Sequence, residues 1–283
     1  SDLIEIHNSY EYIKYIRFLG YKGRLILHMH NDYLSKINNS EFRYIENQIS
    51  VLVVCSNHLA ERIFSKFKNV SCKIEVVYNG VNFKLFHPNQ SKKDTNTIGY
   101  VGRIEFNKGL HRLLEVYKII IQKIPNIRLQ IIGCSSFGKI KQTAYEKKCI
   151  TEIEYINNNL GGNIELVGYV HHKDLKEWFN QFTLFCSLPI ENEAFGMTFI
   201  ESLACKTPVL GTNVGGISES IGFSDMIISK DSSADDLSEK ILYLISNKNM
   251  LANLAEAGYK RVINEFDWSI IRLSKAKILC QYH

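Results

Sequence analysis

The sequence predicts an α/β protein with two Rossmann-type, doubly wound domains, each built on a parallel sheet. Short apolar runs alternate with longer amphipathic stretches along the whole chain, which is the pattern of buried parallel strands covered by helices. The 283 residues are 45% hydrophobic, which is enough for sizeable cores. The polar stretch Asn89–Asn96 has the composition of a linker and indicates where the first domain ends.

In the first half of the chain, the apolar runs have the length of strands, and the stretches between them have the apolar spacing of helices. The predicted strands are Leu3–Ile6, Arg24–Met29, Val51–Cys55 and Ile74–Tyr78. The predicted helices are Tyr10–Leu19 and His58–Lys68. The segment Asn79–Pro88 then connects the two halves.

The second half continues the alternation of strand and helix patterns. Its predicted strands are Thr97–Val101, Arg128–Ile132, Ile164–Leu166, Leu184–Ser187 and Pro208–Leu210. Its predicted helices are Leu110–Lys123, Thr143–Asn158, Lys173–Gln181, one that begins at Gly196, Asp235–Asn247, Met250–Asn264 and a last one over Asp267–Tyr282. In such sheets ligands bind beyond the carboxyl ends of the strands, so we expect the site there.

Composition and charge limit the class of function. The net charge of +5 suits an anionic small ligand and leaves contact with an anionic membrane surface open, but it is too weak to indicate nucleic acid. Seven scattered cysteines form no CxxC and indicate buried thiols in a reducing compartment. No apolar run approaches the 18 residues of a membrane span. We therefore expect a cytoplasmic protein, with peripheral contact at the inner leaflet left open.

The most informative segment runs from Glu193 to Glu219. It places two carboxylates, Glu193 and Glu201, around a Gly196 that opens a helix. The free N–H groups and the positive dipole end of a helix start bind anions without a cationic side chain. Glu201, about one and a half turns into the helix, is suited to accept hydrogen bonds from sugar hydroxyls. A diphosphate beside a ribose indicates a nucleotide; a capped surface helix is the alternative.

A second candidate anion site follows the predicted strand Thr97–Val101. Arg103 and Lys108 lie five positions apart, after this strand and before the next helix. Either residue alone would fit an ordinary solvated turn. Their shared position favours a clamp on phosphate oxygens.

Four motifs, in order and spacing, resemble the donor site of the retaining glycosyltransferases of family 4, the group 1 family with the GT-B fold. Residues 98–109 (IGYVGRIEFNKG) are similar to its strand-GR-x₄-KG element. The other three motifs are residues 78–88 (YNGVNFKLFHP), residues 188–196 (LPIENEAFG) and the segment from Glu193 to Glu219. Asn82 and Ile190 depart from the Asp and Ser that are usual in this family. The resemblance runs from about Asp2 to the C-terminus.

The resemblance implies a role for each matched position. Arg103 and Lys108 would grip the donor diphosphate, Glu201 would hold the ribose, and Glu193 would orient the transferred sugar. Further donor-binding positions implied by the motifs are Gly102, Gly133, Tyr169, Val170, Phe195, Gly196, Met197, Thr198, Gly215 and Gly216. Core packing remains an alternative for Tyr169 and Val170, as a tight turn does for the Gly pair.

The histidines are harder to assign. His28 and His30 fall at the end of one predicted strand, and strand alternation places both on the same face. In the resembling enzymes a histidine at this strand end faces the donor sugar, and His30 aligns with it best. His7 ends an earlier strand near the cleft, and its role stays open. His171 and His172 look like helix-start residues without a metal role.

The resemblance implies transfer of a sugar from a nucleotide-diphosphate donor, with UDP favoured over GDP, to a glycan or lipid-linked acceptor in cell-surface polysaccharide or glycolipid synthesis. No second carboxylate is evident for a double displacement, and the resemblance implies front-face attack with retention. The sequence has no H-E-x-x-H, D-x-D or clustered Asp/His ligand set, so we expect no metal and no cofactor besides the donor.

Other functions stay open. One is a nucleotide-sugar-binding protein without transfer activity; another is a different enzyme of the same fold, such as a sugar-nucleotide epimerase. An NAD dehydrogenase is disfavoured, because no G-x-G-x-x-G follows a strand.

We expect three segments. Residues 1–88 would form an acceptor-side domain, residues 89–265 the donor-binding domain, and residues 266–283 a helix that crosses back to the first domain. Only four candidate strands fall in the first domain, and the family usually spends further residues before this point. We therefore expect this domain to be incomplete, and the isolated chain to bind nucleotide diphosphates but transfer sugar poorly.

Overall fold

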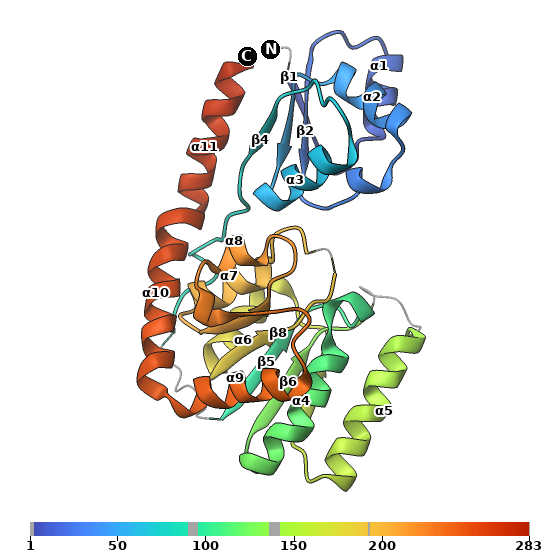
Figure 1. Cartoon of the computed structure of the whole chain (residues 1–283). Coiled ribbons are helices and arrows are strands. Elements are labelled where there is room, and N and C mark those ends of the chain that lie inside the picture. The colour runs from blue at the N-terminus through green and yellow to red at the C-terminus, as the bar shows by residue number, and fades with distance from the viewer. Residues whose placement is uncertain (1–2, 90–95, 136–141, 192, 283) are drawn as a thin grey trace.

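The computed structural model describes residues 3–89, 96–135, 142–191 and 193–282, so that residues 90–95 of the predicted linker lie outside the description. It contains two parallel sheets, which confirms the predicted fold class (Figure 1). The first sheet contains, in spatial order, β1 (Leu3–His7), β2 (Arg24–Met29), β3 (Val51–Val54) and β4 (Ile74–Val76). The second is formed by β5 (Thr97–Val101), β6 (Arg128–Ile132), β7 (Ile164–Gly168), β8 (Leu184–Ser187), β9 (Val209–Thr212) and β10 (Ile227–Ile228).

The strand order of the second sheet creates a crevice. The order is β10-β9-β8-β5-β6-β7, so β5 pairs with β6 on one side and with β8 on the other. The chain therefore leaves β5 in one direction and later returns to build the opposite half of the sheet. In parallel α/β sheets, ligands bind at the carboxyl ends of the strands at such a switch point.

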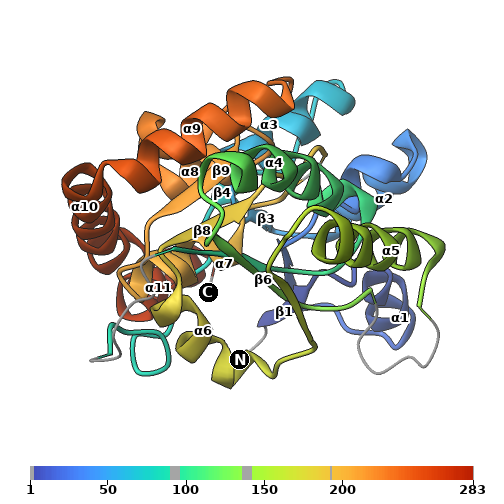
Figure 2. The same ribbon diagram turned by 90° about the horizontal axis from the view of Figure 1, so that it is seen from below.

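Helices cover both faces of the second sheet (Figure 2). One core cluster joins one face of the strands to α4 (Leu110–Lys123), α5 (Ala144–Asn159) and α9 (Ala234–Ser246). Another core cluster joins the opposite face to α6 (Leu175–Gln181), α7 (Met197–Ala204), α8 (Ile217–Ile221) and α10 (Lys248–Phe266).

The first sheet is packed against α1 (Tyr12–Phe18), α2 (Asn39–Gln48) and α3 (Asn57–Lys66) on one side. The sequence did not predict α2, because most of its residues are polar and only Phe42 and Ile45 supply buried apolar side chains. The side chain of Asn38 caps its start by accepting a hydrogen bond from the Glu41 N–H.

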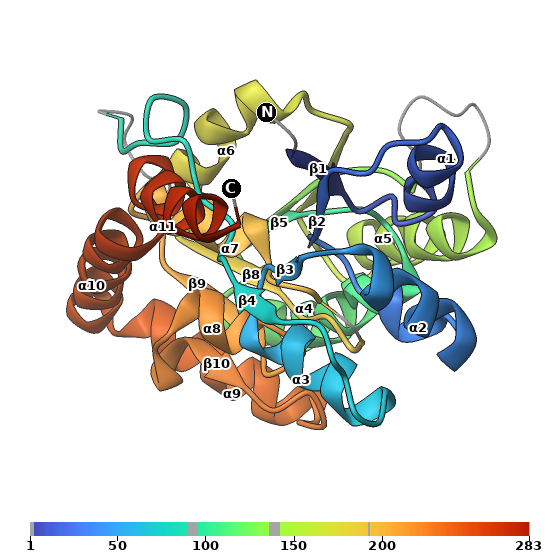
Figure 3. The same cartoon turned by 90° about the horizontal axis from the view of Figure 1, so that it is seen from above.

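A C-terminal helix, α11 (Trp268–Gln281), covers the other side of the first sheet (Figure 3). Its Ile271 and Ile278 are buried against Ile26, Val51 and Val53. The chain thus passes from the second sheet through α10 and returns to the first, where Leu3 of β1 and Tyr282 after α11 pack against the same core cluster.

The connecting segment after β4 is tied to the junction between α10 and α11. The Val81 N–H donates to the Phe266 carbonyl at 2.8 Å, and the Trp268 N–H donates to the Val81 carbonyl at 3.3 Å. These bonds hold the interdomain segment beside the carboxyl edge of the second sheet.

The two domains are also joined directly at the start of α3. The carboxylate of Glu219, on α8, accepts hydrogen bonds from the backbone N–H groups of Asn57 and His58, both at 2.8 Å. The Ser56 hydroxyl donates to the Ala194 carbonyl at 2.7 Å. The first N–H groups of a helix have no partner within the helix and attract anions, so a carboxylate from one domain completes a helix of the other.

Among the described residues, no helix combines the length and the apolar character needed to span a bilayer.

We expect Glu219→Ala to lower the free energy of unfolding by about 1–2 kcal/mol, because two helix-start N–H groups lose a charged acceptor. The loss should also loosen the contact between domains, which small-angle X-ray scattering would report as a larger radius of gyration. Glu239→Ala, an exposed position on α9, is the matched control. Equal stability and scattering of the two variants would contradict the role of Glu219.

Candidate functional site

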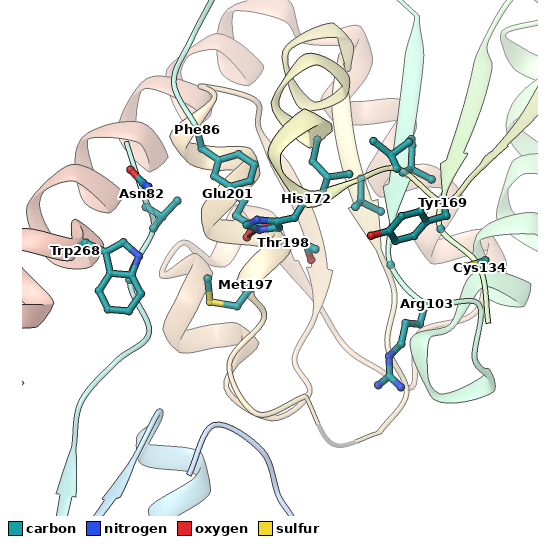
Figure 4. Close-up of a pocket in the computed structure, with 18 residues that line it drawn as sticks. Asn82, Phe86, Arg103, Cys134, Tyr169, His172, Met197, Thr198, Glu201 and Trp268 are labelled. Carbon is teal, nitrogen blue, oxygen red and sulfur yellow. Dashed lines mark hydrogen bonds and ion pairs between the residues drawn. The ribbon is translucent and has the colours of Figure 1, made fainter. Parts of the chain in front are cut away.

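A cavity of about 480 Å³ lies beyond the carboxyl ends of β5, β6 and β7, beside the start of α7 (Figure 4). Cavities of this size commonly hold small molecules. Its lining residues are Gly80, Val81, Asn82, Phe86, Val101, Gly102, Arg103, Ile132, Gly133, Cys134, Tyr169, Val170, His172, Leu175, Met197, Thr198, Glu201 and Trp268. Trp268 and Asn82 lie at one end of the cavity, Arg103 and Cys134 at the other, and Glu201 between them.

Glu201 is the buried carboxylate of this cavity. It lies on α7, behind Met197 and Thr198 at the helix start, and is only 3% exposed. Its Oε1 lies 2.8 Å from Nε2 of His172, and this hydrogen bond raises the pKa of His172 above its ordinary value. A buried carboxylate that faces a cavity can accept hydrogen bonds from ligand hydroxyls.

His172 was missed by the sequence analysis, which treated it as a helix-start residue. It does begin a 3₁₀ turn, His172–Asp174, but its side chain points into the cavity. The available signal was its position four residues after Gly168, at the end of a strand of the second sheet.

Gly102 and Gly133 allow the ends of β5 and β6 to approach closely. Gly133 has a φ of +138°, and a Cβ there would lie 1.9 Å from the Gly102 carbonyl oxygen. A larger residue at this position would therefore separate the two strand ends. Arg103 follows directly and extends its guanidinium to Glu105, with Nη1 2.6 Å from Oε1. Its side chain is about half exposed and is one of the cationic groups at the cavity.

Tyr169 and Val170 also line the cavity, directly after β7. Tyr169 is 55% exposed, so it is not a core residue. This exposure argues against plain core packing for Tyr169, which was the alternative left open.

Lys108 and Glu193 pair with each other. Lys108 lies in a 3₁₀ turn before α4, and its Nζ lies 2.5 Å from Oε2 of Glu193 in the loop before α7. Both side chains are about one-fifth exposed. Neither residue lines the cavity, so the structure separates this ion pair from the group formed by Arg103 and Glu201.

Gly215 and Gly216 position the loop that carries Glu193. A Cβ on Gly215, whose φ is +62°, would lie 1.9 Å from the Glu193 carbonyl oxygen. The Gly216 N–H donates to this same oxygen at 2.8 Å. The described contact of the pair is thus with the Glu193 loop, and neither glycine lines the cavity.

Phe195 and Gly196 also lie outside the cavity lining. Phe195 is 1% exposed and packs between the rings of Tyr78 and Phe266, with centroid distances of 5.5 and 5.4 Å. Its packing joins the interdomain segment to α10. Gly196 is the N-cap of α7.

The remaining predicted residue, His30, lies in the first domain within a group of three histidines. The register of β1 and β2 places His7 beside His28, and His30 follows on the same face. Nδ1 of His7 lies 2.9 Å from Nε2 of His30. The sequence analysis identified no clustered ligand set, and the structure corrects this point, because the three side chains come together only when β1 and β2 pair.

The three histidines differ in exposure, since His28 is buried, His30 is half-buried and His7 is exposed. Burial, followed by the proximity of His28, lowers the pKa of His30 to about 4. Burial also lowers the pKa of His28, although its hydrogen bond to Glu5 opposes this. For Glu5, burial alone would raise the pKa, but hydrogen bonds from His28 and Lys275 lower it to about 2.

Comparison with known proteins matches most of the second domain to a described family. Residues 82–261, well over half of the chain, match the family described as "Glycosyl transferases group 1". The matched range contains Arg103, Lys108, Glu193 and Glu201.

Individual relatives are more distant. The chain is 32% identical over 229 residues to the capsular polysaccharide biosynthesis glycosyltransferase CapM of Staphylococcus aureus, which covers 80% of this chain and 53% of CapM. It is 23% identical to the lipopolysaccharide 1,2-N-acetylglucosaminetransferase of Salmonella typhimurium, over 95% of this chain and 70% of that protein. The chain therefore spans only about half the length of CapM.

Solved structures share the fold. Anabaena HepE, solved in complex with UDP and glucose, superposes with a TM-score of 0.80 at 18% identity, over 99% of this chain and 77% of HepE. A likeness at this identity establishes the arrangement of the two domains.

We expect the pKa of His172, measured by NMR titration, to lie above 6.5 in the native chain and to fall in Glu201→Gln, because the amide keeps the shape of the carboxylate without its charge. The variant of the other partner, His172→Ala, should leave the fold intact, since the imidazole is largely exposed. An unchanged pKa in Glu201→Gln would show that Glu201 does not hold the His172 proton.

Proposed function

This chain belongs to the group 1 glycosyltransferases, and we propose that it moves a sugar from a nucleotide-diphosphate donor to a glycan or lipid-linked acceptor with retention of configuration. The proposed donor is a UDP-sugar in preference to a GDP-sugar. The proposed transfer step uses no metal ion. We place the reaction in the cytoplasm or at the inner face of its membrane.

The observation that carries the proposal is the position of the cavity. It lies at the switch point of a parallel sheet, between Arg103 on one strand end and the start of α7. If the diphosphate of a nucleotide binds at the start of α7, the ribose joined to it would lie beside Glu201, further along the same helix. UDP bound to HepE, a protein of the same fold, supports a uridine nucleotide.

The departing diphosphate requires positive charge, and the second domain offers three sources. Arg103 borders the cavity, the first two residues of α7 line it, and Lys108 lies next to Glu193. An ammonium group has three donors, so Lys108 can keep its bond to Glu193 and still donate to a phosphate oxygen. Preorganised donors of this kind stabilise a leaving anion without a metal ion.

Glu193 and Glu201 would accept hydrogen bonds from different hydroxyl groups of the donor. Glu201 would exchange part of its hydrogen bonding with His172 for the ribose hydroxyls. Glu193, held by Lys108, would accept hydrogen bonds from hydroxyls of the transferred sugar. The acceptor hydroxyl would attack from the side of the leaving group, and a leaving phosphate oxygen would take its proton.

The acceptor class is supported only by relatives. CapM is named for capsular polysaccharide biosynthesis, and the Salmonella protein for lipopolysaccharide. Both names describe cell-surface glycans, so we propose an acceptor of this class for the present chain.

The function is tested by measuring binding and transfer separately. Calorimetric titration with UDP and GDP should give tighter binding for UDP. A panel of UDP- and GDP-sugars is then tested with lipid-linked and glycan acceptors, and we expect release of UDP. The rate in chelating buffer should differ by less than about twofold from the rate with excess Mg²⁺ or Mn²⁺. Slow transfer is the outcome that the sequence predicts, whereas binding with no detectable transfer to any acceptor would favour a nucleotide-sugar-binding protein. Turnover that requires Mg²⁺ or Mn²⁺ would refute the metal-free step.

We expect Lys108→Ala to lower kcat by ~10²–10³, since one preorganised donor to the leaving group is lost. Lys118→Ala is the matched control, because Lys118 on α4 forms a similar ion pair at 2.9 Å with Glu152 on α5, and not with the loop before α7. Both variants should keep the circular dichroism spectrum of the native chain. Near-native turnover of Lys108→Ala at saturating donor would remove Lys108 from the mechanism.

A further inference from the structure

We propose that His7, His28 and His30 form a binding site for a divalent transition metal ion of the Zn²⁺ type, at the carboxyl edge of the first sheet. The ligand atoms would be Nδ1 of His7, Nε2 of His28 and Nε2 of His30. This site is separate from the donor cavity, since none of the three residues lines it. The proposal does not depend on the identity of the donor.

The three side chains are brought together by the pairing of two strands. His7 ends β1 and lies opposite His28 on β2. His30 follows one alternation later, and its ring centroid is 4.1 Å from that of His28 and 5.2 Å from that of His7. One ligand atom from each residue lies within 4.8 Å of the other two. Nitrogen atoms that share a tetrahedral Zn²⁺ at about 2.0–2.1 Å lie about 3.4 Å apart, so a small rotation of the exposed His7 ring closes the site.

One nitrogen of the group is buried without a partner. His28 is 4% exposed, and its Nε2 has no hydrogen bond. A buried polar atom without a partner typically costs about 1–3 kcal/mol. Its position beside two other imidazole rings makes it a ready metal ligand.

The outer nitrogens of the rings already have acceptors, which fixes their tautomers. Nδ1 of His28 lies 3.1 Å from Oε1 of Glu5, and Nδ1 of His30 lies 2.6 Å from Oδ1 of Asn79. Carboxylate and amide oxygens accept hydrogen bonds, so both Nδ1 atoms carry the proton and both Nε2 atoms have a free lone pair. Metal-bound histidines in proteins are commonly oriented by such outer acceptors.

The tautomer of His7 determines whether the group can bind an ion. A proton on its Nδ1 would satisfy the 2.9 Å contact with His30, but it would leave Nε2 of His28 unpaired. If this proton moves to Nε2 of His7, which lies 3.3 Å from Oε1 of Glu5, all three inward nitrogens can bind one ion. The exchange of tautomer requires no net gain or loss of protons.

The donor set selects the type of ion. Imidazole nitrogen suits Zn²⁺, Cu²⁺, Fe²⁺ and Ni²⁺, whereas Mg²⁺ and Mn²⁺ prefer oxygen. Three histidines leave a fourth position for water or another ligand. Lys275 lies 2.8 Å from the same Glu5 oxygen, and its positive charge opposes a cation, while the ionised Glu5 offsets it. An ion at this site is therefore distinct from the Mg²⁺ or Mn²⁺ tested for the transfer step.

The experiment titrates the full chain, stripped of metal, with Co²⁺ and then with Zn²⁺. We expect one Co²⁺ per chain, with the intense visible d–d absorption of a tetrahedral nitrogen site, displaced by one equivalent of Zn²⁺. His7→Ala removes one ligand from an exposed position and should abolish the band without loss of fold. Glu5→Gln should weaken Zn²⁺ binding by about 10–100-fold, because the outer acceptor loses its charge. His171→Ala, an exposed histidine of the second domain, should bind like the native chain.

The outcomes separate the alternatives. A band that survives His7→Ala, or equal Zn²⁺ binding by the native chain and a His7→Ala/His28→Ala double variant, would overturn the site. If His30 contacts only the donor sugar, the native chain would show no Co²⁺ band, although His30→Ala would still lower turnover. The metal titrations use no nucleotide, so failure of the metal site would leave the proposed transfer untouched, and the reverse also holds.

Discussion

The site depends on the close approach of Gly215 and Gly216 to the loop before α7. Because Gly215 has no side chain, the Gly216 N–H reaches the Glu193 carbonyl. This contact sets the loop that pairs Glu193 with Lys108 and leads into the start of α7. The same turn begins α8, whose Glu219 reaches the start of α3 in the other domain. One backbone contact therefore places the helix start and the link between the domains together.

Most strands could be predicted, because buried parallel strands are apolar on both faces and leave a strong pattern. The predicted strands from Leu3–Ile6 to Leu184–Ser187 overlap β1 to β8. The helix α2 and the two-residue strand β10 could not be predicted in this way. Their stability comes from packing and from neighbours distant in sequence, such as the pairing of β10 with β9.

The site could be predicted in part, for a geometric reason. Parallel strands end at one edge, so residues that follow different strands, such as Arg103 and Gly133, meet there. The side-chain partners across that edge could not be predicted. The pairing of Glu201 with His172 joins residues 29 positions apart, and it depends on how α7 packs beside α6, which follows the turn that carries His172. The meeting of His7 with His28 depends likewise on the register of two strands.

The two domains present opposite hydrogen-bonding groups, and under the proposed function this difference limits where a diphosphate would bind. On the first domain, Glu5 and Asn79 hold the outer N–H groups of His28 and His30, so the inward nitrogens present lone pairs. Lone pairs repel phosphate oxygens. On the second domain, Arg103 and the start of α7 present donors. Under the proposed function, the anionic end of a donor would therefore bind to the second domain, and the histidines of the first domain would face neutral hydroxyl groups or a cation.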